Sequence, residues 1–387
     1  MTNIKVLYTG GTIGSIKVKQ TVSGKDAYQI MTRSMAREKG FDIKNSQSLL
    51  VEMYKSKYKS NINFYEEEIS DVLSENMTIS RWNAITDYLR NFDSRNFDGI
   101  IITHGTDTLG YFANYLSMIL NNVDIPVMVV SSNYEITDSR ANGIFNFKAA
   151  CDFIDNVCLP GVFVPYRYND KNKILYGSRV LQCFAPQDDF GCITMNGNIP
   201  LGIINDNGNF EVVDKQLYSE IDSRSRYSFK EKNLIDEFKT LNSKLLVIEP
   251  YVGLDYTNYN LKNVDAILHT LYHSGTACTD KDALSCNINN FLKNVRSNGG
   301  NESDIGFFVG PIYGKENRDL YASSSELVDN RANFIMNTSK ENAYAKLLIA
   351  YSIAKGLRPD LLNKYVDNFM ITEFNNEFIQ KDKVLRK

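Results

Sequence analysis

The chain of 387 residues is poor in the side chains from which many metal and redox sites are built. It has three histidines, His104, His269 and His273, and they form no zinc-ligand pattern. Its six cysteines are scattered along a long chain, so we expect reduced thiols rather than a disulfide framework. We therefore expect no metal ion and no disulfide-stabilised scaffold.

The chain also lacks an excess of charge of either sign and any long apolar run. Its formal net charge is −3, which predicts no basic surface for nucleic acid or an anionic membrane. No segment approaches the roughly 20 apolar residues of a membrane-spanning helix. The first residues enter an apolar strand directly, without the regions typical of a signal peptide. We expect a cytoplasmic protein that binds neither nucleic acid nor membranes.

What the sequence does contain is an alternation of apolar strand patterns and amphipathic helix patterns. Strand patterns such as Ile4–Tyr8 and Ile100–Thr103 alternate with helix patterns such as Ile79–Phe92. This order predicts an α/β fold with a mostly parallel sheet flanked by helices. A helix is also predicted near Ala27–Gly40.

The alternation is interrupted once, by a charged and polar stretch around Ser219–Lys232. The length of the chain is sufficient for two domains. We therefore predict a larger N-terminal α/β domain over residues 1–215, a linker over residues 216–243 and a smaller C-terminal α/β domain over residues 244–387.

Two segments rich in glycine and hydroxyl residues follow strand patterns. Residues 9–15 read Thr-Gly-Gly-Thr-Ile-Gly-Ser, and residues 103–108 read Thr-His-Gly-Thr-Asp-Thr. Ligands of open α/β sheets bind at the carboxyl ends of strands, so two such segments indicate a reaction centre. Their glycine spacing matches neither a phosphate-binding loop nor a dinucleotide fingerprint, so we expect no nucleotide cofactor.

Individual side chains in these segments have both a chemical and a structural interpretation. Thr12 can act as a nucleophile if a neighbouring group accepts its proton, while Gly11 would let a substrate approach and leave amide N–H groups free to donate. The alternative is a tight turn with a threonine cap. Thr106 and Asp107 can bind a substrate near a helix N-terminus, or Asp107 can simply stabilise that helix.

A third segment, Leu73–Met77, lies between these two in the sequence. Ser74 can donate a hydrogen bond to a substrate carboxylate, and Glu75 can accept one from an α-ammonium group. More often, such residues before a helix form an ordinary cap or loop.

In this order the segments resemble the signatures of the bacterial L-asparaginase/glutaminase family, whose members use a threonine nucleophile. Further similar segments extend the resemblance over nearly the whole chain, and the helix around Lys346 is closest to the cytoplasmic type I branch. The segments that resemble the family are Thr9–Gly14, Ser74–Glu75, Thr103–Leu109, Ala141–Asn146, Tyr272–Ala277, Tyr321–Ser323 and Ala343–Leu347.

The resemblance implies a two-domain fold and hydrolysis of the side-chain amide of asparagine or a related amide. Thr12 would form an acyl ester and release ammonia, and water would then cleave the ester. Thr106 and Asp107 would supply a second hydroxyl and a carboxylate for the substrate ammonium group, and Tyr28 would be the tyrosine of the mobile loop. A small amino acid would be the substrate, and the chain would form a homodimer or homotetramer.

One position departs from the family pattern. The family has a lysine in a Gly-x-Arg-x-x-Lys segment, whereas the matching residues 177–182 end in Gln182. An amide cannot carry a proton as an amine does, so this departure predicts low or altered activity. Lys171 and Lys173 lie nearby in the sequence and are expected to be solvated. Two alternatives to hydrolysis stay open: a catalytically impaired protein that binds an acidic amino acid or its amide, and an enzyme that transfers the acyl group to an amine.

Overall fold

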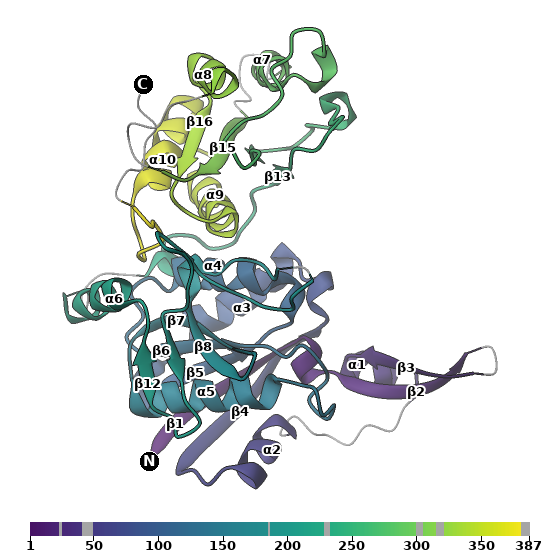
Figure 1. The fold of residues 1–387 in the computed structure, drawn as a ribbon, viewed down its shortest axis with the longest axis vertical. Helices are drawn as coiled ribbons and strands as arrows, with labels where there is room; N and C mark the ends of the chain where they lie inside the picture. The colour runs from purple at the N-terminus through teal and green to yellow at the C-terminus, as the bar shows by residue number, and fades with distance from the viewer. Residues whose placement is uncertain are drawn as a thin grey trace. The chain divides into compact units, whose positions relative to one another are not determined.

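The structure is a computed structural model of the chain, and it describes residues 1–22, 25–40, 49–184, 186–227, 233–298, 305–314 and 321–380. The chain divides into two compact units, Met1–Glu237 and Phe238–Lys387 (Figure 1). Each unit contains a sheet with parallel strands and flanking helices, which confirms the predicted α/β class.

The division between the units falls between Glu237 and Phe238, inside the range 216–243 that we predicted to be a linker. Part of that range belongs to helix α6 (Lys215–Tyr227), which lies in the first unit. Residues 228–232 of the predicted linker lie outside the described residues.

The first unit is built on an eight-stranded sheet with the order β12-β11-β8-β7-β6-β5-β1-β4. The strands from β7 to β4 run parallel, and the remaining three pair antiparallel. The first strand of the chain, β1, therefore lies inside the sheet between β4 and β5. The strands are β1 (Thr2–Gly10), β4 (Ile62–Val72), β5 (Gly99–Thr103), β6 (Pro126–Val130), β7 (Gly161–Tyr168), β8 (Lys171–Tyr176), β11 (Gly202–Ile204) and β12 (Phe210–Val212).

Aromatic contacts join the helices of this unit in pairs. Trp82 stacks on Tyr115 with ring centroids 4.6 Å apart and joins α3 to α4, while Tyr54 and Phe147 join α2 to α5 at 5.5 Å. These pairs cover strands that are themselves apolar, such as Gly99–Thr103, which is buried throughout. The helices are α1 (Arg33–Glu38), α2 (Leu49–Lys57), α3 (Ile79–Arg90), α4 (Leu109–Ile119) and α5 (Gly143–Asn156).

The predicted helix over Ala27–Gly40 is wrong for its first half. Strands β2 (Ile16–Val22) and β3 (Lys25–Met31) form an antiparallel hairpin, visible as a projecting ribbon in Figure 1. The helix α1 begins only after Thr32, whose hydroxyl accepts a hydrogen bond from the Met35 N–H at 3.2 Å. Pairing with β2 supplies backbone hydrogen bonds that outweigh the local helix pattern. Another short hairpin is formed by β9 (Ile193–Thr194) and β10 (Gly197–Asn198).

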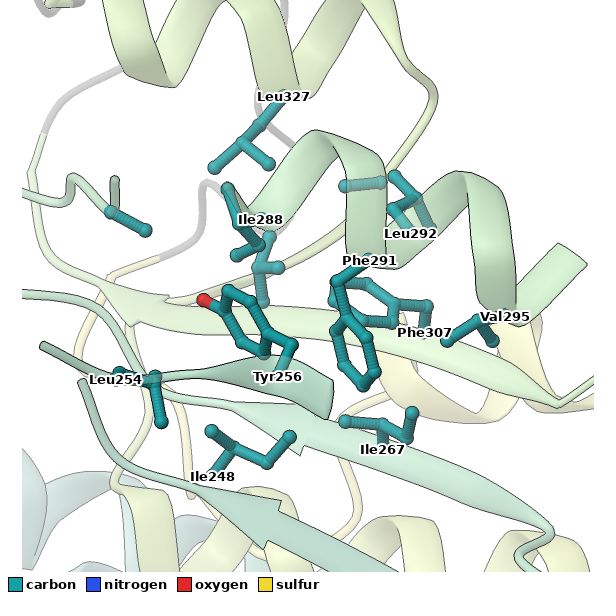
Figure 2. Packing of buried hydrophobic residues seen from close by; sticks show 13 residues of the cluster. Ile248, Leu254, Tyr256, Ile267, Ile288, Phe291, Leu292, Val295, Phe307 and Leu327 are labelled. Carbon is teal, nitrogen blue, oxygen red and sulfur yellow. The ribbon is translucent and has the colours of Figure 1, made fainter. Parts of the chain in front are cut away.

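The second unit has a smaller parallel sheet with the order β13-β14-β15-β16. Figure 2 shows the core of this unit, where Phe291 of α7 stacks on Tyr256 with ring centroids 4.5 Å apart. Its elements are β13 (Leu245–Ile248), β14 (Ala266–His269), α7 (Ile288–Asn298), β15 (Gly306–Ile312), α8 (Ala322–Asp329), β16 (Asn333–Met336), α9 (Lys340–Ala354) and α10 (Pro359–Ile371).

Among the helices that the structure describes, none combines the length and the apolar composition needed to cross a membrane.

Candidate active site

The loops that follow β1 and β5 touch each other at the carboxyl edge of the large sheet. Gly10 and Gly11 have φ values of 99° and 79°, a region in which side chains are strained. A Cβ atom on Gly11 would lie 2.3 Å from the backbone nitrogen of Gly105. Its own N–H donates to the Val72 carbonyl at 2.8 Å, so it is not the free donor that we expected. Gly11 therefore allows the backbones of the two loops to pack closely at Gly105.

The loop after β4 joins the same cluster through Ser74. A Cβ atom on Gly105 would lie 2.4 Å from the Ser74 hydroxyl oxygen, so glycine is required here as well. The structure thus brings together the three segments that the sequence analysis singled out. Each contains a short 3₁₀ turn: η1 (Thr12–Gly14), η2 (Ser74–Asn76) and η4 (Thr106–Thr108).

Ser74 and Asp107 are hydrogen-bonded to each other. The Ser74 hydroxyl donates to Oδ2 of Asp107 at 3.2 Å and accepts from the Asp107 N–H, also at 3.2 Å. Ser74 is buried, whereas Asp107 is exposed. The carboxylate is therefore held in one orientation and still open to solvent, which suits a group that receives a cationic ligand.

His104 is connected to the Ser74–Asp107 pair through the Thr108 hydroxyl. Its ring is fully buried and stacks on Phe112 with centroids 4.2 Å apart. The Thr108 hydroxyl donates to the Ser74 carbonyl at 3.2 Å, so it accepts from Nε2 of His104, which lies 3.2 Å away. Burial lowers the pKa of His104 to about 3. The imidazole is thus neutral at pH 7 and acts as a hydrogen-bonding support.

The two candidate hydroxyl groups lie in the turns of this cluster. Thr12 in η1 and Thr106 in η4 are partly exposed. Within the described part of the chain, neither hydroxyl has a hydrogen-bond partner, so both are available to a ligand. Glu75 follows Ser74 in η2 and is exposed.

Tyr28 lies apart from this cluster of loops. It is on β3 of the hairpin, is 63% exposed, and has the Lys17 ammonium 4.9 Å from its ring centroid. The structure thus groups Gly11, Ser74 and Asp107, whereas Tyr28 is carried by a separate element.

Gln182 lies beside the second loop. Its Nε2 donates to the Asp107 carbonyl at 2.5 Å, and its Oε1 accepts from the Gly110 N–H at 2.7 Å. The nearby Lys173 is not solvated as we expected: it forms an ion pair with Asp189 and donates to the Phe190 carbonyl at 2.7 Å. Lys171 is exposed, as expected.

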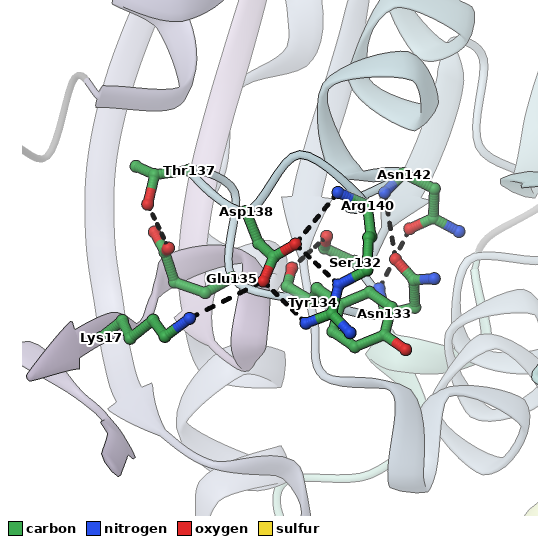
Figure 3. A network of polar contacts seen from close by, with 9 residues as sticks. All are labelled: Lys17, Ser132, Asn133, Tyr134, Glu135, Thr137, Asp138, Arg140 and Asn142. Carbon is green, nitrogen blue, oxygen red and sulfur yellow. Dashed lines mark hydrogen bonds and ion pairs between the residues drawn. The ribbon is translucent and has the colours of Figure 1, made fainter. Parts of the chain in front are cut away.

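The loop after β6 forms its own polar network (Figure 3). The Asn133 and Asn142 side chains each accept from the other residue's backbone N–H at 3.0 Å, and the Asp138 carboxylate binds Arg140. Arg140 holds the pKa of Asp138 well below its usual range. Asp138 also lies 3.8 Å from the Lys17 ammonium, which links this loop to the hairpin. The Ala141–Asn146 segment is thus used for structure.

The sequence analysis missed Asn114, a fully buried residue of α4. Its Nδ2 donates to the Gly110 carbonyl and to the Val180 carbonyl, both at 2.8 Å. The available signal was an amide side chain in the largely apolar helix Leu109–Ile119, because buried polar groups need partners.

The side chains that could bind a metal ion or form disulfides are scattered in the described part of the chain. Among the described residues, no group of three His, Cys, Asp or Glu side chains is placed to hold a metal ion. The cysteines are unpaired. The cluster around Asp107 offers hydroxyl, carboxylate and amide groups for chemistry.

Comparisons with known proteins agree with these observations. A family model described as asparaginase, N-terminal, matches residues 3–216. A glutamyl-tRNA(Gln) amidotransferase subunit of Methanosphaera stadtmanae is 25% identical over 360 residues, which are 90% of this chain and 72% of that protein. L-asparaginase of Thermococcus kodakarensis is 31% identical over 183 residues, 45% of this chain and 46% of that protein.

A solved structure has the same fold. The thermostable L-asparaginase from Thermococcus kodakarensis matches with a TM-score of 0.69 at 20% identity, covering 97% of this chain and 99% of that one. At this identity the match describes the fold alone.

Proposed function

The chain belongs to the asparaginase family, and we propose that it hydrolyses the side-chain amide of L-asparagine or a related amide. The observation that carries the proposal is the convergence of three loops, in which Gly11 and Ser74 both touch Gly105. This packing places the loop of Thr12 next to the Ser74–Asp107 pair. A nucleophile and a ligand-binding carboxylate thus share one edge of the sheet.

In the proposed reaction, the Thr12 oxygen forms a bond to the amide carbon and the carbon–nitrogen bond breaks. The hydroxyl proton leaves with the nitrogen, which departs as ammonia. Water then attacks the acyl ester, the carbon–oxygen bond to Thr12 breaks, and a proton from the water passes to the threonine oxygen. Asp107 and Glu75 accept hydrogen bonds from the substrate ammonium group, and Thr106 and Tyr28 supply further hydroxyl groups.

The test is ammonia release from asparagine and glutamine by the purified full chain. Thr12→Ala should abolish release, whereas Thr12→Ser should retain part of it because a hydroxyl is still present. Binding of aspartate, measured by calorimetry, should persist in Thr12→Ala. Equal ammonia release by the wild type and Thr12→Ala would contradict the proposal.

A second candidate is an amidotransferase role. The amidotransferase relative from Methanosphaera stadtmanae matches 90% of this chain, whereas the L-asparaginase relative matches 45%. In that role the nitrogen or the acyl group would pass to an acceptor other than water. Consumption of asparagine or glutamine that stays low with the amide alone and rises with an added acceptor would favour this candidate. Free ammonia would rise with it if the acyl group is transferred, but not if the nitrogen is.

Because Gln182 stands at the family's lysine position, a third candidate is a catalytically impaired protein that binds an acidic amino acid or its amide. Aspartate binding with no ammonia release from any amide tested would favour it. We also propose a cytoplasmic homodimer or homotetramer, on the resemblance to the type I branch. Light scattering on the purified chain would give the number of copies.

A further inference from the structure

The N-terminus of α4 has no cap from its own segment. Thr108 occupies the N-cap position, but its side chain makes no capping hydrogen bond and donates to the Ser74 carbonyl instead. The first N–H groups of a helix have no partner within the helix. Gly110 carries one of these groups, and an unpaired buried N–H costs about 1–3 kcal/mol.

Gln182, 72 residues further along the chain, supplies the missing acceptor for the Gly110 N–H. We propose that Gln182 is a positioning residue, whose amide holds the Asp107 turn against the first turn of α4 and so fixes Asp107 for its ligand. Oε1 accepts from the Gly110 N–H at 2.7 Å, and Nε2 donates to the Asp107 carbonyl at 2.5 Å. The consequence for ligand binding rests on the proposed function.

The segment that carries Gln182 is itself fastened to α4. Asn114 donates to the Val180 carbonyl at 2.8 Å. A Cβ atom on Gly177 would lie 2.2 Å from the Ser117 hydroxyl oxygen, and one on Gly110 would lie 2.6 Å from Gln182 Oε1. The segment and the helix thus pack together from Gly110 to Ser117. This packing fixes the backbone of Gln182 relative to α4, so its amide is held next to the Asp107 turn.

A lysine cannot make the same pair of hydrogen bonds. An ammonium group has donors and no acceptor. It could donate to the Asp107 carbonyl, but it would leave the Gly110 N–H facing a positive charge without an acceptor. Gln182 and this turn are thus matched to each other. Substituting the family's lysine here should therefore weaken the site rather than restore a missing function.

The experiment compares aspartate affinity, by calorimetry, in Gln182→Met, Gln182→Glu and Gln182→Lys. Methionine has a similar length and can make neither hydrogen bond, so affinity should fall about 10-fold, the loss expected for roughly 1.4 kcal/mol. Gln216→Met is the matched control, because Gln216 is exposed on α6 and bonds only to Glu220 among the described contacts. It should bind aspartate as the wild type does.

Gln182→Glu tests the hydrogen bond that the Gln182 Nε2 donates to the Asp107 carbonyl. Its carboxylate can accept from Gly110, but it repels the Asp107 carbonyl until it is protonated. Affinity relative to the wild type should therefore be low at pH 8 and rise towards pH 5, while Gln182→Met shows no such rise. Asp107 on η4 and Cys183 beside Gln182 are the neighbouring ionisable groups, and the wild type measured at each pH is the reference for them.

A readout independent of turnover and ligand is amide hydrogen exchange at Gly110, which should be faster in Gln182→Met than in Gln216→Met. Wild-type affinity and exchange in Gln182→Met would overturn the proposal, as would a 10-fold gain in ammonia release in Gln182→Lys. Faster exchange with unchanged affinity would leave Gln182 a merely structural residue and also overturn it. Absence of ammonia release in every variant concerns the proposed function instead.

Discussion

The loop His104–Thr108 and the hairpin of β2 and β3 both carry residues that the family resemblance assigns to the reaction, and they are held in contrasting ways. In the loop, His104 and Thr108 form a connected set of partly buried hydrogen bonds, which Ser74 of the loop after β4 joins. The hairpin is held by its own strand pairing, by a small apolar cluster in which Val18 and Met31 pack with Ala36 of α1, and, at Lys17, by an ion pair with Asp138. Tyr28 on this hairpin is largely exposed.

The contrast separates two requirements of a reaction centre. Groups that orient a ligand need support from packing and from surrounding hydrogen bonds, and the loop provides it for Asp107. A group that enters only when a ligand is present belongs on an element with few buried contacts. Substitutions in the loop should therefore affect folding and binding together, whereas substitutions at exposed positions of the hairpin, such as Tyr28, should spare folding.

The largest effect is expected for Gly11→Ala, which would break the contact between the first two loops. The added methyl group meets the Gly105 backbone, and φ at this position is 79°. Strain and crowding together should cost about 3 kcal/mol or more of folding stability, as measured by urea unfolding. The control is Gly14→Ala, since a Cβ atom there would meet nothing within 4 Å. Equal stability of the two variants would contradict the described packing.

Ser74→Ala should have the next largest effect. It removes the donor to the Asp107 carboxylate and the acceptor of the Asp107 N–H, at a cost of about 1–3 kcal/mol. Aspartate affinity should fall along with the unfolding free energy. Ser56→Ala on α2 is the control, because that side chain is exposed. Unchanged affinity in Ser74→Ala would mean that Asp107 is oriented by other groups.

Acid should weaken the loop through His104. The pKa of this ring falls from its ordinary value of 6.5 to about 3 on folding. Below pH 6.5 the unfolded chain binds a proton that the folded chain excludes. Stability should therefore decrease as the pH falls towards 3, by at most about 1.4 kcal/mol per pH unit. Urea unfolding at pH 7 and pH 5 should show a smaller difference in His104→Asn than in the wild type. An equal difference would argue against a buried neutral ring.

The smallest effect on stability is expected on the hairpin. Tyr28→Phe removes one hydroxyl from a side chain that is 63% exposed, so the unfolding free energy should change by less than about 0.5 kcal/mol. If Tyr28 acts in the proposed reaction, ammonia release should nevertheless fall by at least about 100-fold. Tyr65→Phe, at an exposed position of β4, should leave both quantities unchanged. A large loss of stability in Tyr28→Phe would remove the contrast between the loop and the hairpin.

The sequence allowed the sheet and its reactive edge to be predicted because both depend on local patterns. Short apolar runs rich in β-branched residues, such as Gly99–Thr103, favour buried strands, and the glycines after them predict close contacts. The hairpin was mistaken for a helix because its pairing partner decides its conformation. The amide of Gln182 suggested a chemical defect, because its two hydrogen-bond partners lie more than 70 residues earlier and no local pattern connects them.

The position of β1 has a consequence for how the protein is made. This strand lies between β4 and β5, and its last partners are in Gly99–Thr103. At about 5–20 residues per second, the ribosome needs roughly 5–20 s to add the residues that complete this pairing. Until then an apolar segment lacks at least one of its two neighbours and is exposed to aggregation. This strand therefore waits for much of the domain that follows it, and molecular chaperones should recognise it during that interval.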